Sequence, residues 1–521
     1  MPIIPILLSD SAATVDYKVY LAGQAAATEA DLAKLRRRRA YYVGDHELLL
    51  SADQRAFLAG VIDDDADGWP VDNKCRAVVD KIKSRLSVIG IRDANGNKRT
   101  FEQAEGEPGD GGDVAPFDPN ATDPVSRAVA WWTDNDMDRF EGEVYKAALR
   151  DGEGFVLVDA TAGGMPRYTL AEMFDGTTGV RMVYEDTQTR MKPVAAIKYW
   201  YTMDPTGADG TNVARCTVYT ASAIYKYARL TTRAQATLYA NRIKGSTTDD
   251  GWTPVVDEGD AAWPLPWLDA AGQPLGLAVV RFVSPRGSLI DPVIGLNNAL
   301  NKANLDMLAV GDQQGFGLIT VQYDTLPPLS SGDDPTTAAD GLGLRPGRAL
   351  ETTGAVSKLP ADDMAGLLAL AGHWVQAISG NSSIPVYEFV PLTSEVPSGA
   401  ALQMLDSSLA DVADECSLWF GSAWRQVMEL SQKLDALYGT GTDDIVRLFP
   451  IWKETRRKSV DVEMLKLQLE RGQVGLQADQ QGLQQQQAMA AAGGRPGIAA
   501  RIQAVAQPTP PTNGATSEAT P

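Results

Sequence analysis

The chain has 521 residues, of which 44% are hydrophobic and 22% charged, proportions that are ordinary for a folded protein with more than one core. The formal net charge of −20 argues against a protein that grips nucleic acid tightly, because such proteins neutralise phosphates with Lys and Arg. Only two histidines and three well-separated cysteines occur, which excludes most zinc sites, a disulfide framework and most histidine-activated nucleophiles.

The cysteine usage favours folding in a reducing, cytoplasmic compartment. The apolar start MPIIPILLSD is short and has no basic region, so we expect no signal peptide. No stretch approaches the roughly 18 uncharged apolar residues of a membrane span, so we expect no membrane partner.

The first predicted helices lie before residue 160. Residues 31–50 predict a helix that ends in a turn at Gly44, and residues 72–92 predict a helix followed by a short strand, SVIGIR. Residues 93–124 form a loop rich in Gly, Pro and Asp. Residues 123–154 then predict two helices, with Pro124 at a first helical position.

The next region, residues 154–285, contains β-branched and aromatic runs separated by turn residues. This pattern predicts a mostly antiparallel β region. A helix follows, and its start is marked by Asp291 and Pro292, which are typical of the cap and the first helical position.

This helix contains the stretch GLNNALNKANLDML, with four asparagines, although each asparagine costs up to ~0.7 kcal/mol relative to alanine inside a helix. Apolar residues spaced three and four apart form one face of the helix. Asn297, Asn301 and Asn304 lie on another face.

The last part of the chain predicts two strands, FGLITVQYDTL and RPGRALETTG, around a loop, and then a helix at 361–379. Residues 380–398 contain prolines that cannot continue a helix, and a third helix follows at 398–436. From about residue 476 the chain is rich first in Gln and Ala and then in Pro, Thr and Ser, and we expect it to be largely disordered.

Chemical motifs are few. No P-loop, HExxH or GxSxG motif occurs. The acidic stretch 63–74 fits the first half of an EF-hand loop but places Lys74 where calcium needs a bidentate glutamate, so a solvated loop is the simpler interpretation. The basic run KLRRRR at 34–39 could contact phosphate or an acidic partner, or could form a charged helix face. We therefore expect no enzyme activity, no cofactor and no metal.

The order of several segments resembles the portal proteins, or head–tail connectors, of tailed bacteriophages. The resemblance spans about residues 35–475 and rests on order and spacing. The segments that carry it are YYVGDHEL with NKCRAVVDKIKSRLSVIGIR, AWWTDNDMDRFEGEVYKAALRDGEGFVLV, LGLAVVRFVSPRGSLIDPVIGLNNALNKANLDMLAVGDQQGFGLITV, EVPSGAALQMLDSSLADVADECSLWFGSAWRQVMEL and PIWKETRRKSVDVEMLKLQLERGQVG.

The resemblance implies an α+β portal-protein fold with a mixed α/β wing, a helical stem, a small β-containing clip and a helical crown. The implied parts, in chain order, are an N-terminal arm (1–34), the wing (35–290), the first stem helix (291–316), the clip (317–360), the second stem helix (361–380), the tunnel loop (381–397), a long helix back to the wing (398–439), the crown (440–475) and the tail (476–521).

The resemblance also implies a function. Portal subunits form a ring, usually of twelve copies, at a capsid vertex, and double-stranded DNA is packaged and ejected through the ring without sequence specificity. The implied partners are other copies of the chain, the terminase large subunit, the head–tail adaptor, and the major capsid and scaffolding proteins. The implied location is the virion, and the host cytoplasm during assembly. Ring closure needs head-to-tail interfaces, which the helices at 361–379 and 398–436 are expected to supply.

Three sets of residues become candidates under this resemblance. Uncharged asparagines could line a DNA channel, or could simply bond to neighbouring helices or solvent; they are Asn297, Asn301 and Asn304. The tunnel loop would include Pro385, Val386, Tyr387, Glu388 and Phe389. Basic clip residues could form positive rings or pair with acidic residues of the next subunit; they are Arg345, Arg348 and Lys358.

Two other functions remain open from the sequence. The chain could be a different structural protein of the virion, such as a minor head or adaptor protein. It could also be a metal-dependent nuclease, for which only the carboxylates in 63–67 and in DNDMD at 134–138 are available.

Overall fold

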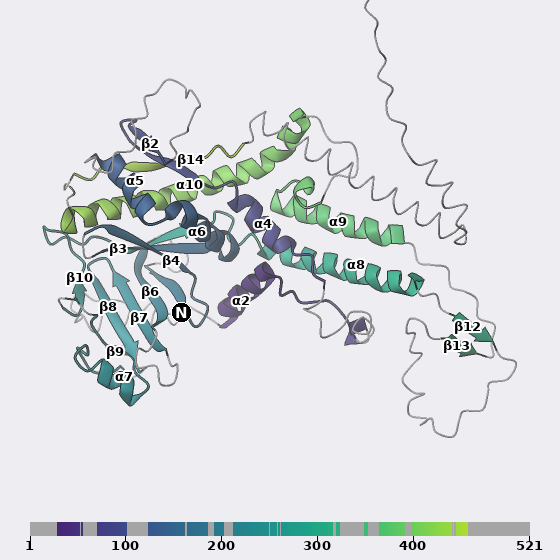
Figure 1. The fold of residues 1–521 in the computed structure, drawn as a ribbon, viewed down its shortest axis with the longest axis horizontal. Helices are drawn as coiled ribbons and strands as arrows, with labels where there is room; N and C mark the ends of the chain where they lie inside the picture. Colours follow the sequence, from purple (N-terminus) through teal and green to yellow (C-terminus); the bar gives the residue numbers. More distant parts are fainter. Residues whose placement is uncertain are drawn as a thin grey trace, which may run out of the picture. The chain divides into compact units, whose positions relative to one another are not determined.

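The computed structural model describes much of the chain between residues 29 and 456. The described residues are 29–52, 54–55, 70–101, 123–161, 164–185, 192–202, 212–248, 251–257, 259–260, 262–315, 319–322, 349–352, 364–390, 399–439, 441 and 444–456. The chain divides into two compact units, Met1–Phe389 with Ser407–Thr455 and Val390–Asp406 with Arg456–Pro521. The fold described below is that of the first unit (Figure 1).

The predicted early helices are present, and local chemistry explains their ends. They are α2 (Glu29–Val43), α4 (Lys74–Lys83), α5 (Pro124–Asp134) and α6 (Met137–Asp151). The Asn73 side chain accepts a hydrogen bond from the N–H of Arg76 and caps α4, and Pro124 opens α5 as predicted. Gly44 follows α2 with a φ of 101°, a left-handed conformation that favours glycine.

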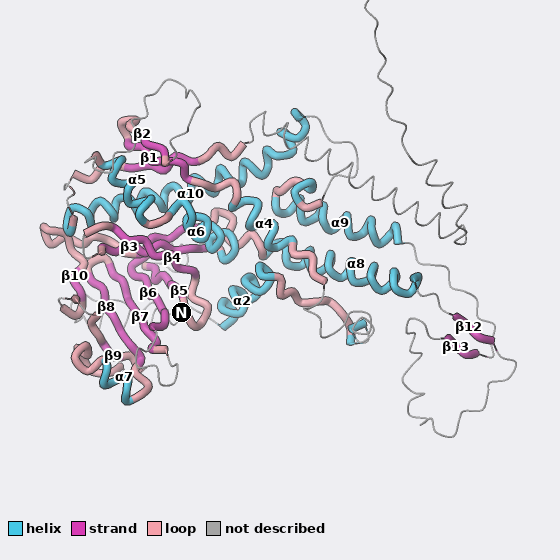
Figure 2. Tube along the Cα trace, viewed as in Figure 1, coloured by secondary structure: helices cyan, strands magenta, loops and turns pink. Residues whose placement is uncertain are grey.

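A three-stranded antiparallel sheet has the order β11-β3-β4 and lies at the centre of this unit; Figure 2 labels its strands β3 and β4. Its strands are β3 (Glu153–Ala160), β4 (Pro166–Glu172) and β11 (Val279–Val283). One face packs in the main core with the helices, through residues such as Val156 and Phe282. The other face packs on a second sheet, where Val279 joins Met182 and Ala196. The central sheet therefore has a helical layer on one side and a sheet on the other.

The second sheet follows the order β10-β8-β7-β6-β5, with β9 paired to β8, and its strand pairs are antiparallel. Its strands are β5 (Gly179–Tyr184), β6 (Pro193–Thr202), β7 (Val213–Thr220), β8 (Ala223–Arg229), β9 (Thr253–Pro254) and β10 (Leu265–Pro266). The predicted antiparallel region is confirmed. A short helix that the sequence pattern missed, α7 (Arg233–Leu238), is held by a capping box between Thr232 and Gln235.

A third sheet has the order β14-β1-β2 and includes residues that the sequence analysis had assigned to the crown. Its strands are β1 (Val88–Asp93), β2 (Lys98–Thr100) and β14 (Leu448–Trp452). Residues 440–475 were expected to form a helical crown, which is wrong for 448–452 because these residues form strand β14 and pair antiparallel with β1. Pro450 within LFPIW also disfavours a helix. Residues 457–475 lie outside the described part of the chain.

Long helices and a short strand pair complete the fold, close to the predicted bounds. They are α8 (Asp291–Gly315), β12 (Ile319–Gln322), β13 (Ala349–Thr352), α9 (Met364–Ser382), the 3-10 turn η2 (Val386–Glu388) and α10 (Gly399–Tyr438). α8 and α9 lie side by side (Figure 1), and β12 and β13 pair in parallel. The predicted helices at 291–316, 361–379 and 398–436 and the two strands between the first two are confirmed.

Candidate functional site

The side chain of Asn297 is fully buried where α8 meets α4. Its Oδ1 atom accepts hydrogen bonds from the N–H groups of Lys74, at 2.8 Å, and Cys75, at 3.2 Å. These N–H groups lie in the first turn of α4 and have no partner inside that helix. The Nδ2 atom of Asn297 donates to the carbonyl of Asp72 at 2.8 Å. A carboxamide suits this position because one uncharged side chain supplies both a donor and an acceptor.

Asn301, one turn further along α8, completes this contact together with His46. Its Oδ1 atom accepts from the N–H of Asp72 at 2.8 Å, and its Nδ2 atom donates to Nδ1 of His46 at 3.0 Å. Nδ2 of Asn297 lies 3.2 Å from the same ring nitrogen. We call Asn297, Asn301, His46 and the backbone of residues 72–75 the asparagine joint.

The protonation state of His46 follows from its partners. Its Nε2 atom lies 3.0 Å from the carbonyl oxygen of Tyr41, which can only accept a hydrogen bond, so the ring proton resides on Nε2. Nδ1 then accepts from the two amide groups. Burial lowers the pKa of His46 below its ordinary value, because the charged form is poorly solvated there. The asparagine joint therefore selects a neutral imidazole.

The prediction that Asn297 and Asn301 line a channel is therefore wrong. These side chains are 0% and 2% exposed, and the same chain already bonds their polar atoms. The alternative interpretation, internal hydrogen bonding, is the correct one for this pair. Asn298 is also buried and donates to the hydroxyl of Tyr41 at 2.8 Å. Asn304 is partly exposed, and its place on a channel stays a prediction.

The basic run 34–39 in α2 binds the start of α8. Arg38 donates from Nε and Nη2 to the two carboxylate oxygens of Asp291, at 2.7 and 2.5 Å, and Lys34 lies 3.0 Å from the same carboxylate. Burial alone would raise the pKa of Asp291, but the hydrogen bonds from Arg38 and Lys34 lower it below its ordinary value. The N-terminus of α8 stabilises the same negative charge.

Arg39, the last residue of this run, binds the fully buried carboxylate of Asp151 at 3.0 Å. Arg150 donates to both oxygens of that carboxylate at 2.7 Å. Arg38 and Arg39 are only 15% and 20% exposed at their side chains. A phosphate contact and a charged surface face, two of the sequence interpretations of the basic run, do not fit these two arginines; their acidic partners are carboxylates of the same chain.

The segment after α9 turns back onto α4. Glu388, whose side chain is 8% exposed, accepts from Nζ of Lys81 at 2.6 Å and lies 3.9 Å from Arg85. The carbonyl of Phe389 accepts from Nζ of Lys74 at 3.2 Å. α4 is thus bound both by the asparagine joint and by the chain that leaves α9.

The five residues assigned to a tunnel loop consequently lie in the body of the fold. Tyr387 is buried, and Val386 and Phe389 pack against the main core. The positions concerned are Pro385, Val386, Tyr387, Glu388 and Phe389, and their role as a tunnel loop in a ring stays a prediction. Residues 391–398 of the predicted loop lie outside the described residues, as do the three basic clip candidates, Arg345, Arg348 and Lys358.

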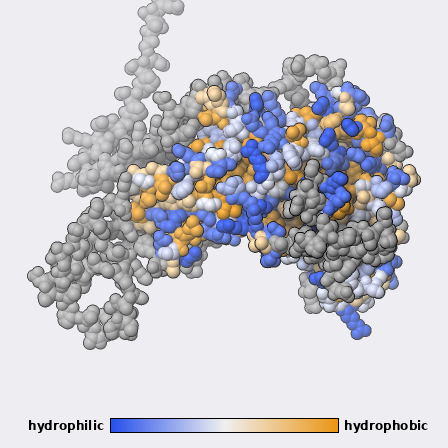
Figure 3. All heavy atoms as spheres, turned by 180° about the vertical axis from the view of Figure 1, so that it is seen from behind, coloured by the Kyte–Doolittle hydropathy of each residue, from blue (hydrophilic) through white to orange (hydrophobic). Residues whose placement is uncertain are grey.

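α9 presents an unusual surface for a helix exposed to solvent. It has no Asp, Glu, Lys or Arg from Met364 to Ser382. Its first two turns expose large apolar side chains, with Met364, Leu368 and Leu370 at 37%, 66% and 42%. Figure 3, which views the molecule from behind, shows hydrophobic surface at the end where α8 and α9 lie. A helix that is apolar on all sides is normally covered by other protein.

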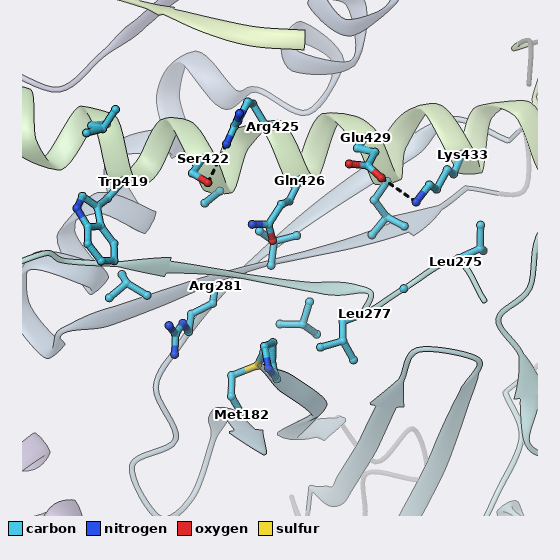
Figure 4. A pocket seen from close by; sticks show the side chains of 18 residues that line it. Met182, Leu275, Leu277, Arg281, Trp419, Ser422, Arg425, Gln426, Glu429 and Lys433 are labelled. Carbon is cyan, nitrogen blue, oxygen red and sulfur yellow. Dashed lines mark hydrogen bonds and ion pairs between the residues drawn. The ribbon is translucent and has the colours of Figure 1, made fainter. Parts of the chain in front are cut away.

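A groove of about 720 Å³ lies at the edge of the central sheet (Figure 4). Strand β11 runs along it, α10 forms one wall from Leu418 to Lys433, and Met182 of β5 and Pro193 of β6 lie on the opposite side. The wall formed by α10 exposes Leu418 and Trp419 by 75% and 49%. The groove is therefore open and lined by both apolar and polar groups.

Within the described segments, no cluster of three or more His, Cys, Asp or Glu side chains could hold a metal ion. The carboxylates at 63–67 are not among the described residues. Asp138 of the DNDMD motif accepts from the indole N–H of Trp132 at 2.7 Å, which is a packing role. None of the helices that the structure describes is both long enough and apolar enough to span a bilayer.

Searches for relatives returned no matching family model and no matching curated protein. The sequence analysis singled out the asparagines and the basic run but missed their partners, which are His46 for the asparagines and Asp151 for Arg39. The rarity of histidine in the chain was the available signal for His46, while nothing local linked Arg38 to Asp291.

Proposed function

We propose that this chain is a subunit of a bacteriophage portal ring, through which double-stranded DNA is packaged and ejected. The order of segments in the sequence supports this, as does the arrangement of residues 291–382. There, two helices lie side by side, and the chain between them contributes a parallel strand pair. This helix–strand–strand–helix order corresponds to the stem and clip of the portal proteins that the sequence resembles.

The observation that carries the proposal is the uncharged surface of α9. A helix with Leu368 two-thirds exposed and no Asp, Glu, Lys or Arg along its length is the kind of surface that other protein normally covers. Neighbouring copies in a ring would provide that cover, and head-to-tail contacts would repeat around the ring until it closes. The terminase, the adaptor and the capsid proteins would then bind the assembled ring rather than the single chain.

A charge placed on α9 tests this assembly. Leu368→Glu would bury an unpaired carboxylate in the interface between copies. The free energy of association would then be less favourable by roughly several kcal/mol per interface. Gln376→Glu is a matched control, since Gln376 is also exposed on α9 and the substitution is nearly isosteric. We expect L368E to reduce the oligomer seen by light scattering after size exclusion and Q376E to retain it. A wild-type chain that is monomeric, or an L368E chain that assembles normally, would contradict the proposal.

A further inference from the structure

Strand β11 has one hydrogen-bonding edge that no described strand uses. It is the outer strand of the order β11-β3-β4 and pairs only with β3 among the described strands. The N–H of Val158 bonds to the carbonyl of Ala278, and the N–H of Ser284 bonds to that of Gly152. In an antiparallel ladder such bonded pairs recur at every second residue. The backbone N–H and C=O groups of residues 280 and 282 therefore also point toward β3. The N–H and C=O groups of 279, 281 and 283 therefore point to the open edge.

The groove described above lies along this edge. Val279, Arg281 and Val283 all line it, and α10 and the second sheet stand on its two sides. An unpaired strand edge between two walls is the arrangement by which proteins bind an extended segment as an additional strand. Backbone hydrogen bonds would provide affinity, and the exposed apolar side chains of α10 would cover alternate residues of the added strand.

Residues 14–21 of this chain, TVDYKVYL, have the composition of such a strand. Val15, Tyr17, Val19 and Leu21 alternate with more polar residues, and β-branched and aromatic side chains predominate. The segment lies outside the described residues and precedes α2 by seven residues. It carries no proline or glycine, which would interrupt a strand.

A linker of seven residues connects this segment to α2, which lies near one strand of the groove. Arg36 in α2 donates from Nε to the carbonyl of Asp175 at 3.0 Å, so the helix lies against the turn that leads into β5. Met182 of β5 lines the groove. Residues 22–28 link the segment to α2, and seven extended residues span up to about 24 Å. The position of α2 beside the turn into β5 favours the groove of the same chain as the site for this segment.

We propose that residues 14–21 bind in the groove as a fourth strand of the central sheet, paired with the open edge of β11 in the same chain. This part of the chain before α2 is then a structural part of the β region formed by the central and second sheets. This inference does not depend on the proposed portal function.

Amide hydrogen exchange resolved to single residues tests the pairing. One variant replaces residues 14–21 with a Gly/Ser stretch of equal length, and a control replaces residues 1–8 in the same way. We expect the N–H groups of 279, 281 and 283 to exchange at least about tenfold faster in the first variant than in the wild type. The N–H groups of 280 and 282, which bond to β3, should change little, and the control should match the wild type. Equal exchange at 279, 281 and 283 in all three proteins would overturn the proposal.

Disulfide trapping tests whether the strand comes from the same chain. Gln426→Cys on the α10 wall is combined with single cysteines at positions 15 to 20; the three native cysteines are buried. We expect cross-links within one chain that alternate in efficiency with a period of two residues. Thr237→Cys on α7, an exposed position away from the groove, should give none. Cross-links only between copies, or without the two-residue period, would overturn the assignment.

Discussion

Asn297 explains why a poor helix former is used in α8. The asparagine costs a fraction of a kcal/mol in helix propensity, but it caps the first turn of α4 with two hydrogen bonds and holds the carbonyl of Asp72 with a third. A leucine or alanine at this position would leave buried backbone N–H groups without partners, and each such group costs about 1–3 kcal/mol. The row of carboxamides thus joins α8 to the start of α4, which is distant in sequence.

The substitution Asn297→Ala should therefore destabilise the protein by about 2 kcal/mol or more, because the N–H groups of Lys74 and Cys75 lose their partner. Asn304→Ala is the matched control on the same helix; it should stabilise by up to about 0.7 kcal/mol or have no effect, since alanine has the higher helix propensity. Chemical denaturation of both variants measures the difference. Equal stability of the two variants would contradict the role assigned to Asn297.

His46 should make stability dependent on pH. The pKa of His46 is lowered in the folded protein relative to the ordinary 6.5, so the unfolded chain binds a proton more readily as pH falls. The stabilisation by the neutral imidazole is complete above about pH 6.5 and is lost as pH falls through the lowered pKa of the folded state. The nearby carboxylates of Asp45 and Asp72 act in the opposite direction but do not reverse the shift.

We expect His46→Gln to flatten the pH dependence of the melting temperature between pH 7.5 and about pH 5, compared with the wild type. His373→Gln is the control, because His373 is the one other histidine of the sequence and lies exposed on α9. It should retain the wild-type slope. Carboxylates elsewhere, including the buried Glu141 with its pKa raised by burial to about 7, titrate in all three proteins and cancel in the comparison. If H46Q retained the wild-type slope, the pKa of His46 would be the same in the folded and unfolded states, which would contradict this account.

At the scale of elements, α2 is held to α8 mainly by Arg38. Arg38→Gln leaves the partly buried carboxylate of Asp291 with Lys34 alone, and we expect a loss of about 1–3 kcal/mol, the range for hydrogen bonds to charged groups. Arg37→Gln is the control on the same helix; its pair with Glu47 is exposed on both sides and should contribute less than about 1 kcal/mol. Hydrogen exchange at the first turn of α8 should rise in R38Q and not in R37Q. The opposite ranking would contradict this account.

The elements that the sequence predicted well are those determined by local signals. Pro124 and Asp123 mark the start of α5, and the alternating runs between 154 and 285 form the expected antiparallel strands. β14 was missed because its partner β1 lies more than 350 residues earlier, so that pairing has no local signature. The asparagine stripe was visible, but its meaning depended on His46 and on the backbone of 72–75, which only the tertiary fold brings to α8.

At the scale of the whole molecule, the proposed function depends on self-association. The net charge of −20 would repeat in every copy of a ring, which would keep passing DNA from adhering to its surface. Asn297 and Asn301 are buried and cannot line a channel. Under this proposal, α8 would face the channel with residues that lie after the asparagine joint in sequence, such as Asn304. The uncharged α9 and the exposed Leu418 and Trp419 of α10 remain surfaces that a partner copy would cover.

Electron microscopy of the purified full-length chain tests the central claim most directly, because it shows assembly and symmetry together. The account predicts closed rings with a central hole, commonly with twelve subunits, in which α9 of each copy is covered by its neighbours. Single, unassociated particles under conditions that support assembly, or an assembly that leaves α9 exposed to solvent, would contradict it.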